Sequence, residues 1–424
     1  MTLAIVVVVL LLLLFSGLPV AFSLAALGTV MLMIKGLPLI MVAQNLHGAV
    51  DNFILLSVPL FLLMSNILLK GGVGRDLFDA VQSWVGHWPG GMGVATLLSC
   101  GLFSAISGSS VATAATVGTV AIPEMTKRGY SRSFTFGLLA AGGTLGILIP
   151  PSIPLIVYGV IAEESIGKLF LAGIGPGLLL IVLFSIYAVL NAVLTSDYER
   201  SARASWIVRR NATLRAIPTG MLAVIMVGGI YAGIFTPTEA SAVGATSALF
   251  LTVFVLRTLK WDDFVQAVRA TLSTTVVLFL VVIGAKIFGK AVTLYQVPMQ
   301  VSQLVDTHVS SVWLFLLIVA AILLFIGLFL ESLSMLLIMV PVLFPTVLAL
   351  NVDPIWFGIF FVVLIEIALI TPPVGLNLFV IQAIAQSPLG EIVRGVLPFI
   401  AIMLFTVLLL WMFPQIALFI PLHL

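Results

Sequence analysis

The stretch Gly146-Ile-Leu-Ile-Pro-Pro-Ser152 has a counterpart, Ala368-Leu-Ile-Thr-Pro-Pro-Val374, that lies 222 residues further along the chain. The same offset superimposes other features of the two regions, namely Pro123 on Pro345 and the apolar run 91–106 on 313–328. A Pro-Pro pair in an apolar segment removes two backbone donors and interrupts a helix. The shared offset therefore predicts an internal repeat in which each copy contains a broken helix.

The composition excludes a chain that folds in water. Of the 424 residues, 62% are hydrophobic and 8% are charged, whereas soluble domains carry roughly a quarter charged residues. The apolar stretch 3–15 has no basic region and no small-residue cleavage site, so we expect a retained helix and not a secretory signal. The net charge of +2 gives no reason to expect nucleic acid as a partner, and Cys100, the single cysteine, excludes an intrachain disulfide.

A membrane-spanning helix needs about 20 apolar residues and ends at glycine, proline or charge clusters. We expect ten crossings, near 2–15, 18–35, 52–70, 131–162, 168–195, 216–235, 238–257, 271–291, 353–386 and 392–418. The stretches 91–125 and 312–347 are too long for one crossing and are polar in the middle, which predicts two re-entrant hairpins. Amphipathic stretches predict interfacial helices at Gly72–His87, Lys260–Ala270 and Val297–His308.

The basic residues predict how these crossings are oriented. One short loop holds five arginines, namely Arg200, Arg203, Arg209, Arg210 and Arg215, and the positive-inside rule places this loop in the cytoplasm. Both termini are then periplasmic, the first hairpin opens inward and the second outward. The sequence therefore predicts an all-α polytopic membrane protein with two inverted repeats, as in many secondary transporters.

The broken helices predict a cation site. Carbonyls freed by the prolines are tolerated at membrane depth only where protein, water or an ion satisfies them. The carbonyls of Gly146, Ile149 and Pro151, together with the hydroxyls of Ser104 and Ser107, form an all-oxygen set that suits an alkali ion. A proline kink with packing glycines is the alternative interpretation.

The hairpin tips predict an anion site. Ser109, Ser110 and Ser332 lie where half-helices begin, and a helix N-terminus directs N–H groups and a positive dipole end at an anion. With Thr144 and Asn377 they form the predicted substrate site, although serines at such places also satisfy local backbone groups. Among the carboxylates, Glu239 is expected to cap a helix. Glu366 is either a proton or cation site or an ion-pair partner.

Four stretches resemble the large membrane subunit of TRAP transporters. They are Ser107-Gly-Ser-Ser-Val-Ala-Thr-Ala-Ala-Thr-Val-Gly118, Gly143-Thr-Leu-Gly-Ile-Leu-Ile-Pro-Pro-Ser-Ile-Pro154, Tyr231-Ala-Gly-Ile-Phe-Thr-Pro-Thr-Glu-Ala240 and Ile370-Thr-Pro-Pro-Val-Gly-Leu-Asn377. The resemblance covers nearly the whole chain and implies an elevator-type sodium symporter of the bacterial inner membrane. It also implies two partners, a small four-helix membrane subunit and a periplasmic substrate-binding protein.

The resemblance further implies two sodium sites and a division of the chain. One site involves Ser104, Ser107, Gly146, Ile149 and Pro151, and the other Gly327, Ala368, Thr371 and Val374. Ala368 departs from the glycine of the family, although its backbone carbonyl serves equally well. Scaffold helices and arms are expected in 1–90 and 196–311, and the hairpins and broken helices of the transport domain in 91–195 and 312–424. Implied substrates are small organic anions, mostly carboxylates such as C4-dicarboxylates and sugar acids, with some sulfonates.

Three other functions are alternatives to this one. A stand-alone divalent-anion:sodium symporter has the same inverted hairpins and needs no partners. An enzyme is disfavoured because the sequence contains no zinc-protease motif, no paired intramembrane aspartates and no nucleophile elbow. We therefore expect no catalytic residue, no cofactor and no metal other than sodium. A channel differs from a carrier in showing no saturable uptake.

Overall fold

The computed structural model describes residues 2–195, 198–308 and 311–423, and their regular structure is entirely helical. In chain order the helices are α1 (Thr2–Phe15), α2 (Val20–Ile34), α3 (Ile40–Val50), η1 (Phe53–Leu56), α4 (Ser57–Lys70), α5 (Val73–Val85), α6 (Gly91–Ser107), α7 (Ser110–Lys127), α8 (Arg132–Leu148), α9 (Ile153–Ala162), α10 (Ile166–Thr195), α11 (Trp206–Tyr231), α12 (Pro237–Phe250), η2 (Leu251–Val255), α13 (Trp261–Leu294), α14 (Val297–His308), α15 (Val312–Gly327), α16 (Ser332–Ala349), α17 (Pro354–Leu369), α18 (Leu376–Ala385), α19 (Leu389–Met412) and α20 (Gln415–His423).

Within the described residues, seven helical segments are long and apolar enough to cross a membrane. They are Phe53–Lys70, Ile166–Thr195, Trp206–Tyr231, Pro237–Val255, Trp261–Leu294, Ser332–Ala349 and Leu389–Met412. The pair α8 and α9, bent by 41° at its break, makes an eighth if it counts as one span. The predicted fold class, an all-α polytopic membrane protein, is confirmed.

The helix boundaries follow the offset seen in the sequence. Helix α7 begins at Ser110 and α16 begins at Ser332, 222 residues later. The starts of α6, α8 and α9 match those of α15, α17 and α18 to within one residue of this offset. Equivalent helices of the two halves also pack in equivalent ways. Helix α7 packs on α18 of the other half, and its counterpart α16 packs on α9, the counterpart of α18. The opposite membrane orientation of the two halves stays a prediction.

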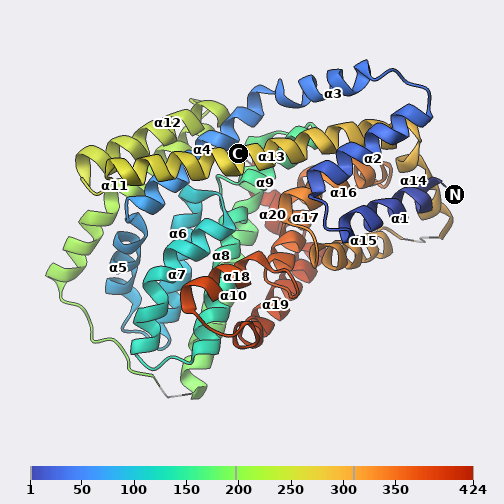
Figure 1. Ribbon diagram of the computed structural model, residues 1–424. Coiled ribbons are helices and arrows are strands. Elements are labelled where there is room, and N and C mark those ends of the chain that lie inside the picture. Colours follow the sequence, from blue (N-terminus) through green and yellow to red (C-terminus); the bar gives the residue numbers. More distant parts are fainter. Residues whose placement is uncertain (1, 196–197, 309–310, 424) are drawn as a thin grey trace.

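One long helix connects the outer elements. In Figure 1, α13 runs along one side of the molecule, from the end near α11 and α12 towards α2 and α14, and it packs against α2, α3, α4 and α16. Helices α8 and α17, which precede the two breaks, are buried along nearly their whole length. At the crossing of α8 and α19, Gly137 and Gly395 bring the backbones together, because a Cβ on Gly137 would collide with the Gly395 carbonyl.

The structure corrects two expectations near the charged segments. The prediction of a separate interfacial helix at Lys260–Ala270 is wrong, because α13 continues without a break from Trp261 to Leu294. No glycine or proline interrupts residues 261–283, so nothing ends the helix there. The arginine-rich loop is also shorter than expected. Helix α11 already begins at Trp206, where the Ser205 side chain accepts a hydrogen bond from Val208 N at 3.4 Å.

Two further elements differ from the predicted crossings. The sequence does not predict α3, because this segment mixes apolar residues with Gln44, Asn45 and His47 and is too short to cross a membrane. The single crossing expected at 392–418 is divided, because Pro414 ends α19 and α20 then packs back against α10. Neither difference changes the broken helices or the hairpins.

Candidate ion and substrate site

The first break lies between α8 and α9. Because Pro150 and Pro151 have no N–H, the carbonyls of Gly146 and Ile147 receive no helical hydrogen bond from four residues further on. Helix α9 begins at Ile153, and the side chain of Ser152 caps it by accepting a hydrogen bond from Leu155 N at 3.3 Å. The break therefore leaves main-chain oxygens without helical partners in a buried part of the protein.

The tip of the first hairpin sits on this break. Helix α6 ends at Ser107, and Gly108 turns the chain with a φ of 62°. A Cβ on Gly108 would lie 2.6 Å from the Pro151 carbonyl oxygen, so only glycine allows this approach. Ser109 then caps α7 by accepting a hydrogen bond from Ala112 N at 3.3 Å.

Hydroxyl and carbonyl oxygens gather where tip and break meet. The hydroxyls of Ser107 and Thr113 lie 2.9 Å apart, and Thr113 donates to the Ser109 carbonyl at 2.9 Å. A Cβ on Gly146 would lie 2.5 Å from that carbonyl and 2.7 Å from Thr113 Oγ1. Ser104, one turn earlier, donates to the Cys100 carbonyl at 2.6 Å.

The structure thus brings Ser107, Gly146 and Pro151 of the predicted first ion site together. Thr113 joins them, although it was not among the predicted ligands. Its position in the first turn after a Ser-Gly-Ser-Ser tip was the available signal, because a hydroxyl four residues after the cap can reach back to the tip.

The second break lies between α17 and α18 and has the same chemistry. Pro372 and Pro373 remove the helical donors to the carbonyls of Ala368 and Leu369. The Thr371 backbone N–H donates to the Ala368 carbonyl at 3.1 Å, and the Thr371 hydroxyl donates to the Ile367 carbonyl at 2.6 Å. Both Pro-Pro bonds are cis.

The second hairpin tip lies against this break. A Cβ on Gly327, at the end of α15, would collide with the Cβ of Ala368, so these two predicted ligands are in contact. Glu331 precedes α16, and its carboxylate accepts a hydrogen bond from the Ser334 hydroxyl at 3.3 Å. Ser332 is half-buried at the first position of α16. Val374 lies in the turn before Gly375.

Asn377 connects the second repeat to the tip of the first hairpin. Its amide nitrogen donates to Ser110 Oγ at 2.6 Å and to the Ala140 carbonyl at 3.0 Å. Its amide oxygen is buried and has no hydrogen-bond partner among the described residues. Two predicted substrate residues, Asn377 and Ser110, are therefore neighbours.

Thr144, a third predicted substrate residue, lies in the protein core. Its hydroxyl donates to the Ala141 carbonyl at 2.6 Å, and its side chain lies beside the carboxyl group of Glu366. Glu366 is 0% exposed, and neither carboxyl oxygen has a hydrogen-bond partner among the described residues. The two residues are separated by the repeat offset of 222, so equivalent positions of the two halves meet here.

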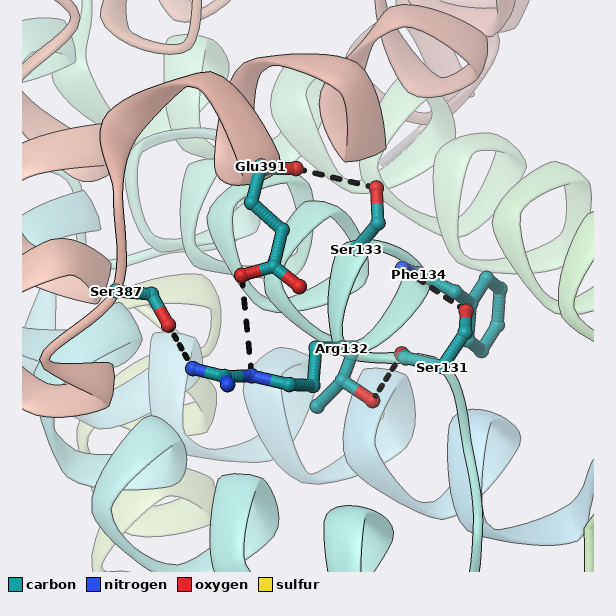
Figure 2. Close-up of polar contacts among 7 residues, drawn as sticks. Ser131, Arg132, Ser133, Phe134, Ser387 and Glu391 are labelled. Atoms are coloured by element: carbon teal, nitrogen blue, oxygen red, sulfur yellow. Dashed lines mark hydrogen bonds and ion pairs between the residues drawn. The ribbon is translucent and has the colours of Figure 1, made fainter.

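A polar joint fixes the start of α8 to the first turn of α19 and to Ser387 just before it (Figure 2). The Arg132 guanidinium contacts the Ser387 hydroxyl and lies 3.8 Å from the Glu391 carboxylate. Ser133 donates to the Glu391 backbone carbonyl at 3.1 Å. Together with the glycine crossing, this joint holds α8 against α19.

Comparisons with known proteins agree with this architecture. Residues 7–416 match the family model described as "Tripartite ATP-independent periplasmic transporter, DctM component". The chain is 40% identical, over 89% of its own length and 88% of the relative, to the C4-dicarboxylate TRAP transporter large permease protein DctM of Pseudomonas aeruginosa. It is 38% identical to the isethionate TRAP transporter permease protein DctMQ of Oleidesulfovibrio alaskensis, covering 95% of this chain and 64% of that protein.

Among solved structures, the YdaH transporter of Alcanivorax borkumensis has a similar fold, with a TM-score of 0.61, 14% sequence identity and coverage of 88% of this chain and 87% of that one. At this identity the likeness concerns the fold alone. The family model and the relatives extend over nearly the whole sequence. The chain therefore belongs to the DctM family, the large permease components of tripartite ATP-independent periplasmic (TRAP) transporters.

Proposed function

We propose that this chain is the membrane permease of a sodium-coupled TRAP transporter that takes up a small organic anion, such as a C4-dicarboxylate. The observation that carries the proposal is the double construction described above. At two places, a pair of prolines interrupts a helix, and the tip of a helical hairpin packs against the break. Unpaired oxygens in a membrane interior are tolerated where an ion or a substrate completes them.

The two breaks are proposed as the sodium sites. Ser104, Ser107, Gly146, Ile149 and Pro151 hold one ion, with Thr113 as an added hydroxyl ligand. Gly327, Ala368, Thr371 and Val374 hold the other. Support comes from the contacts of Gly146 with the first tip and of Gly327 with Ala368. Neutral carbonyl and hydroxyl oxygens hold an alkali ion weakly enough for release in each cycle.

The anion is proposed to bind at the hairpin tips. Helix α7 begins at Ser110 and α16 at Ser332, and such N-termini hold negative charge without an arginine. Asn377 fixes the first tip from the opposite half. The relatives' names support an anionic cargo, because one is named for C4-dicarboxylates and the other for isethionate.

Two partners and an elevator motion belong to the same proposal. A periplasmic binding protein delivers the anion, and a small four-helix subunit supports the scaffold. The relative named DctMQ, which extends well beyond this chain, supports a second membrane component. Both termini are proposed to be periplasmic, with the Arg200–Arg215 region cytoplasmic. The transport segments 91–195 and 312–424 are proposed to slide against 1–90 and 196–311.

Reconstitution into proteoliposomes tests the proposal. We expect uptake of a labelled dicarboxylate only with an inward sodium gradient, the binding protein and the small subunit all present. Uptake without the two partners would favour a stand-alone anion symporter. Uptake that ignores sodium and follows a proton gradient would refute sodium coupling.

A further inference from the structure

Arg209, in the first turns of α11, is a buried cation without an ionic partner. Arg209 is only 8% exposed. Two of its guanidinium nitrogens, Nε and Nη2, are inaccessible and have no hydrogen-bond partner among the described residues. The two ion pairs found in the described part of the chain involve Arg128 and Arg132, not Arg209.

A tryptophan ring covers this guanidinium, and a second tryptophan packs against the first. It lies over the ring of Trp84, with 5.3 Å between the guanidinium carbon and the ring centroid. Trp206 packs edge-on against Trp84 at 5.8 Å, and the Trp84 indole donates to Thr213 Oγ1 at 3.0 Å. A cation–π contact of this kind stabilises an arginine but supplies no counter-charge.

A guanidinium stays protonated in proteins, and a buried charge is costly unless it is paired. The carboxylates on the neighbouring helix α5 do not meet this need. The charges of Arg75 and Arg215 affect the pKa values of Asp76 and Asp79. Arg209 is not among the charges that affect these two carboxyl groups. The missing anion must therefore come from outside the described chain.

The surface around Arg209 has the composition of a membrane–water boundary. Trp84, Trp88, Trp206 and Ile207 are 42%, 50%, 67% and 70% exposed, and exposed tryptophans concentrate at the headgroup level of a bilayer. The neighbouring arginines Arg203 and Arg210 are also exposed. Basic residues at this level attract anionic lipids. A free soluble anion would not require the apolar side chains around the site.

We propose that Arg209, together with Trp84 and Trp206, binds the phosphate of an anionic phospholipid headgroup. The phosphate meets the guanidinium at Nη1, the nitrogen that is not among the inaccessible ones, while the exposed tryptophans and Ile207 contact the glycerol and acyl region. This lipid site does not depend on the proposed transport function, because it uses no residue of the ion or substrate sites.

Native mass spectrometry of the full-length protein in detergent tests the proposal. The wild-type protein, offered equal amounts of phosphatidylglycerol and phosphatidylcholine, should retain phosphatidylglycerol preferentially. Arg209→Gln should weaken this binding about tenfold or more, because a charged hydrogen-bonded contact contributes about 1.5–3 kcal/mol. Arg209→Lys keeps a positive charge without the guanidinium contact and should retain an intermediate affinity. The exposed Arg394→Gln is the matched control and should bind like the wild type.

Three results would overturn the lipid site. Equal retention of the two lipids by the wild-type protein does so without any variant. Unchanged phosphatidylglycerol binding in a folded Arg209→Gln protein does so as well. Displacement of the lipid by inorganic phosphate at equal concentration would assign the site to a soluble anion.

Discussion

The amide nitrogen of Asn377 donates to both Ser110 Oγ and the Ala140 carbonyl, so one side chain of the second repeat holds two helices of the first. A second contact, in which a residue of the first repeat donates to the second repeat, lies elsewhere in the core. The Tyr158 hydroxyl in α9 donates to the Pro354 carbonyl at the start of α17, at 2.6 Å. Each half of the molecule therefore reaches the other through the helix that follows its own break. The hairpin tips and the breaks are consequently positioned as one unit.

Replacing Asn377 should loosen this unit. Asn377→Ala removes both donated hydrogen bonds and leaves the buried Ser110 hydroxyl without its partner, which costs about 1–3 kcal/mol for an unsatisfied group. We expect a lower unfolding temperature in detergent and a strong loss of uptake. Gln382→Ala, at a half-buried position of the same helix, is the control and should unfold like the wild type. An Asn377→Ala protein with unchanged stability would show that the contact is not maintained.

A methyl group at Gly146 should block the first ion site. The added Cβ would lie 2.5 Å from the Ser109 carbonyl oxygen, so either the tip or the break must shift. Overpacking of this kind costs about 1–3 kcal/mol. Because about 1.4 kcal/mol corresponds to a factor of ten, we expect uptake to fall at least tenfold when the ligands of the first ion site are displaced. Gly289→Ala in α13 has no atom within 4 Å of the new Cβ and should be nearly neutral. Normal uptake by Gly146→Ala would contradict the close approach of tip and break.

Removing either of the two ion-site hydroxyls should change sodium dependence without changing folding. Ser107→Ala and Thr371→Ala each remove one hydroxyl oxygen, so we expect the sodium concentration for half-maximal uptake to rise several-fold. Thr371→Ser keeps the hydroxyl and should restore sodium dependence. Membrane insertion, measured on the same vesicles, should change little. Parallel loss of insertion and uptake would identify both residues as structural.

Much of the architecture was predictable because it depends on local chemistry. The backbone nitrogens of the prolines at 150, 151, 372 and 373 cannot donate hydrogen bonds, and Gly108 adopts a φ that other residues rarely adopt. Single residues therefore determine where the breaks and tips occur. Helix ends without such residues were not predictable. Helix α13 continues through 261–270 because nothing stops it, and α3 has neither the length nor the pattern of a span.

The partners of individual side chains in the site were less predictable. Neither the Asn377–Ser110 contact nor the contact between Thr144 and Glu366 follows from residue spacing. Both arise from the way α18 packs on α7 and α17 packs on α8, which is tertiary information. The unpaired state of Arg209 belongs to the same class, because it depends on burial by α5.

The joint of Figure 2 should depend on Arg132 more than on its ion pair. Arg132 and Glu391 are separated by 3.8 Å and are 50% and 32% exposed, and such pairs contribute about 0–1 kcal/mol. Glu391→Gln should therefore change the free energy of unfolding by less than about 1 kcal/mol. Arg132→Ala also removes the contact with buried Ser387 and the cation–π contact with Phe136 at 5.6 Å, so we expect a loss of about 1–3 kcal/mol. Equal losses in the two variants, measured by thermal unfolding, would show that the ion pair dominates.

A polar cleft between α5 and α11 predicts a pH effect on stability. The cleft has a volume of about 630 Å³, and Asp76 and Asp79 face Arg215 across it. Burial raises the pKa of Asp79 above its usual value, and the nearby Arg75 and Arg215 only partly oppose this effect. A raised pKa means that the folded protein holds the proton more tightly than the unfolded chain. The stability that this provides is fully present below the unfolded pKa of about 3.9 and is lost as the pH rises through the folded value.

Asp79→Asn should therefore stabilise the protein at neutral and higher pH, because the amide resembles the protonated acid and carries no charge to desolvate. The gain over the wild type should shrink as the pH falls, since the wild-type carboxyl group then becomes protonated as well. Unfolding temperatures measured in detergent between pH 5 and pH 8 check this, at a constant ionic strength that keeps the screening of Arg75 and Arg215 unchanged. Asp51→Asn changes an exposed carboxylate and should give no comparable trend. A variant that is less stable than the wild type at pH 8 would mean that attraction to the arginines outweighs the burial of Asp79.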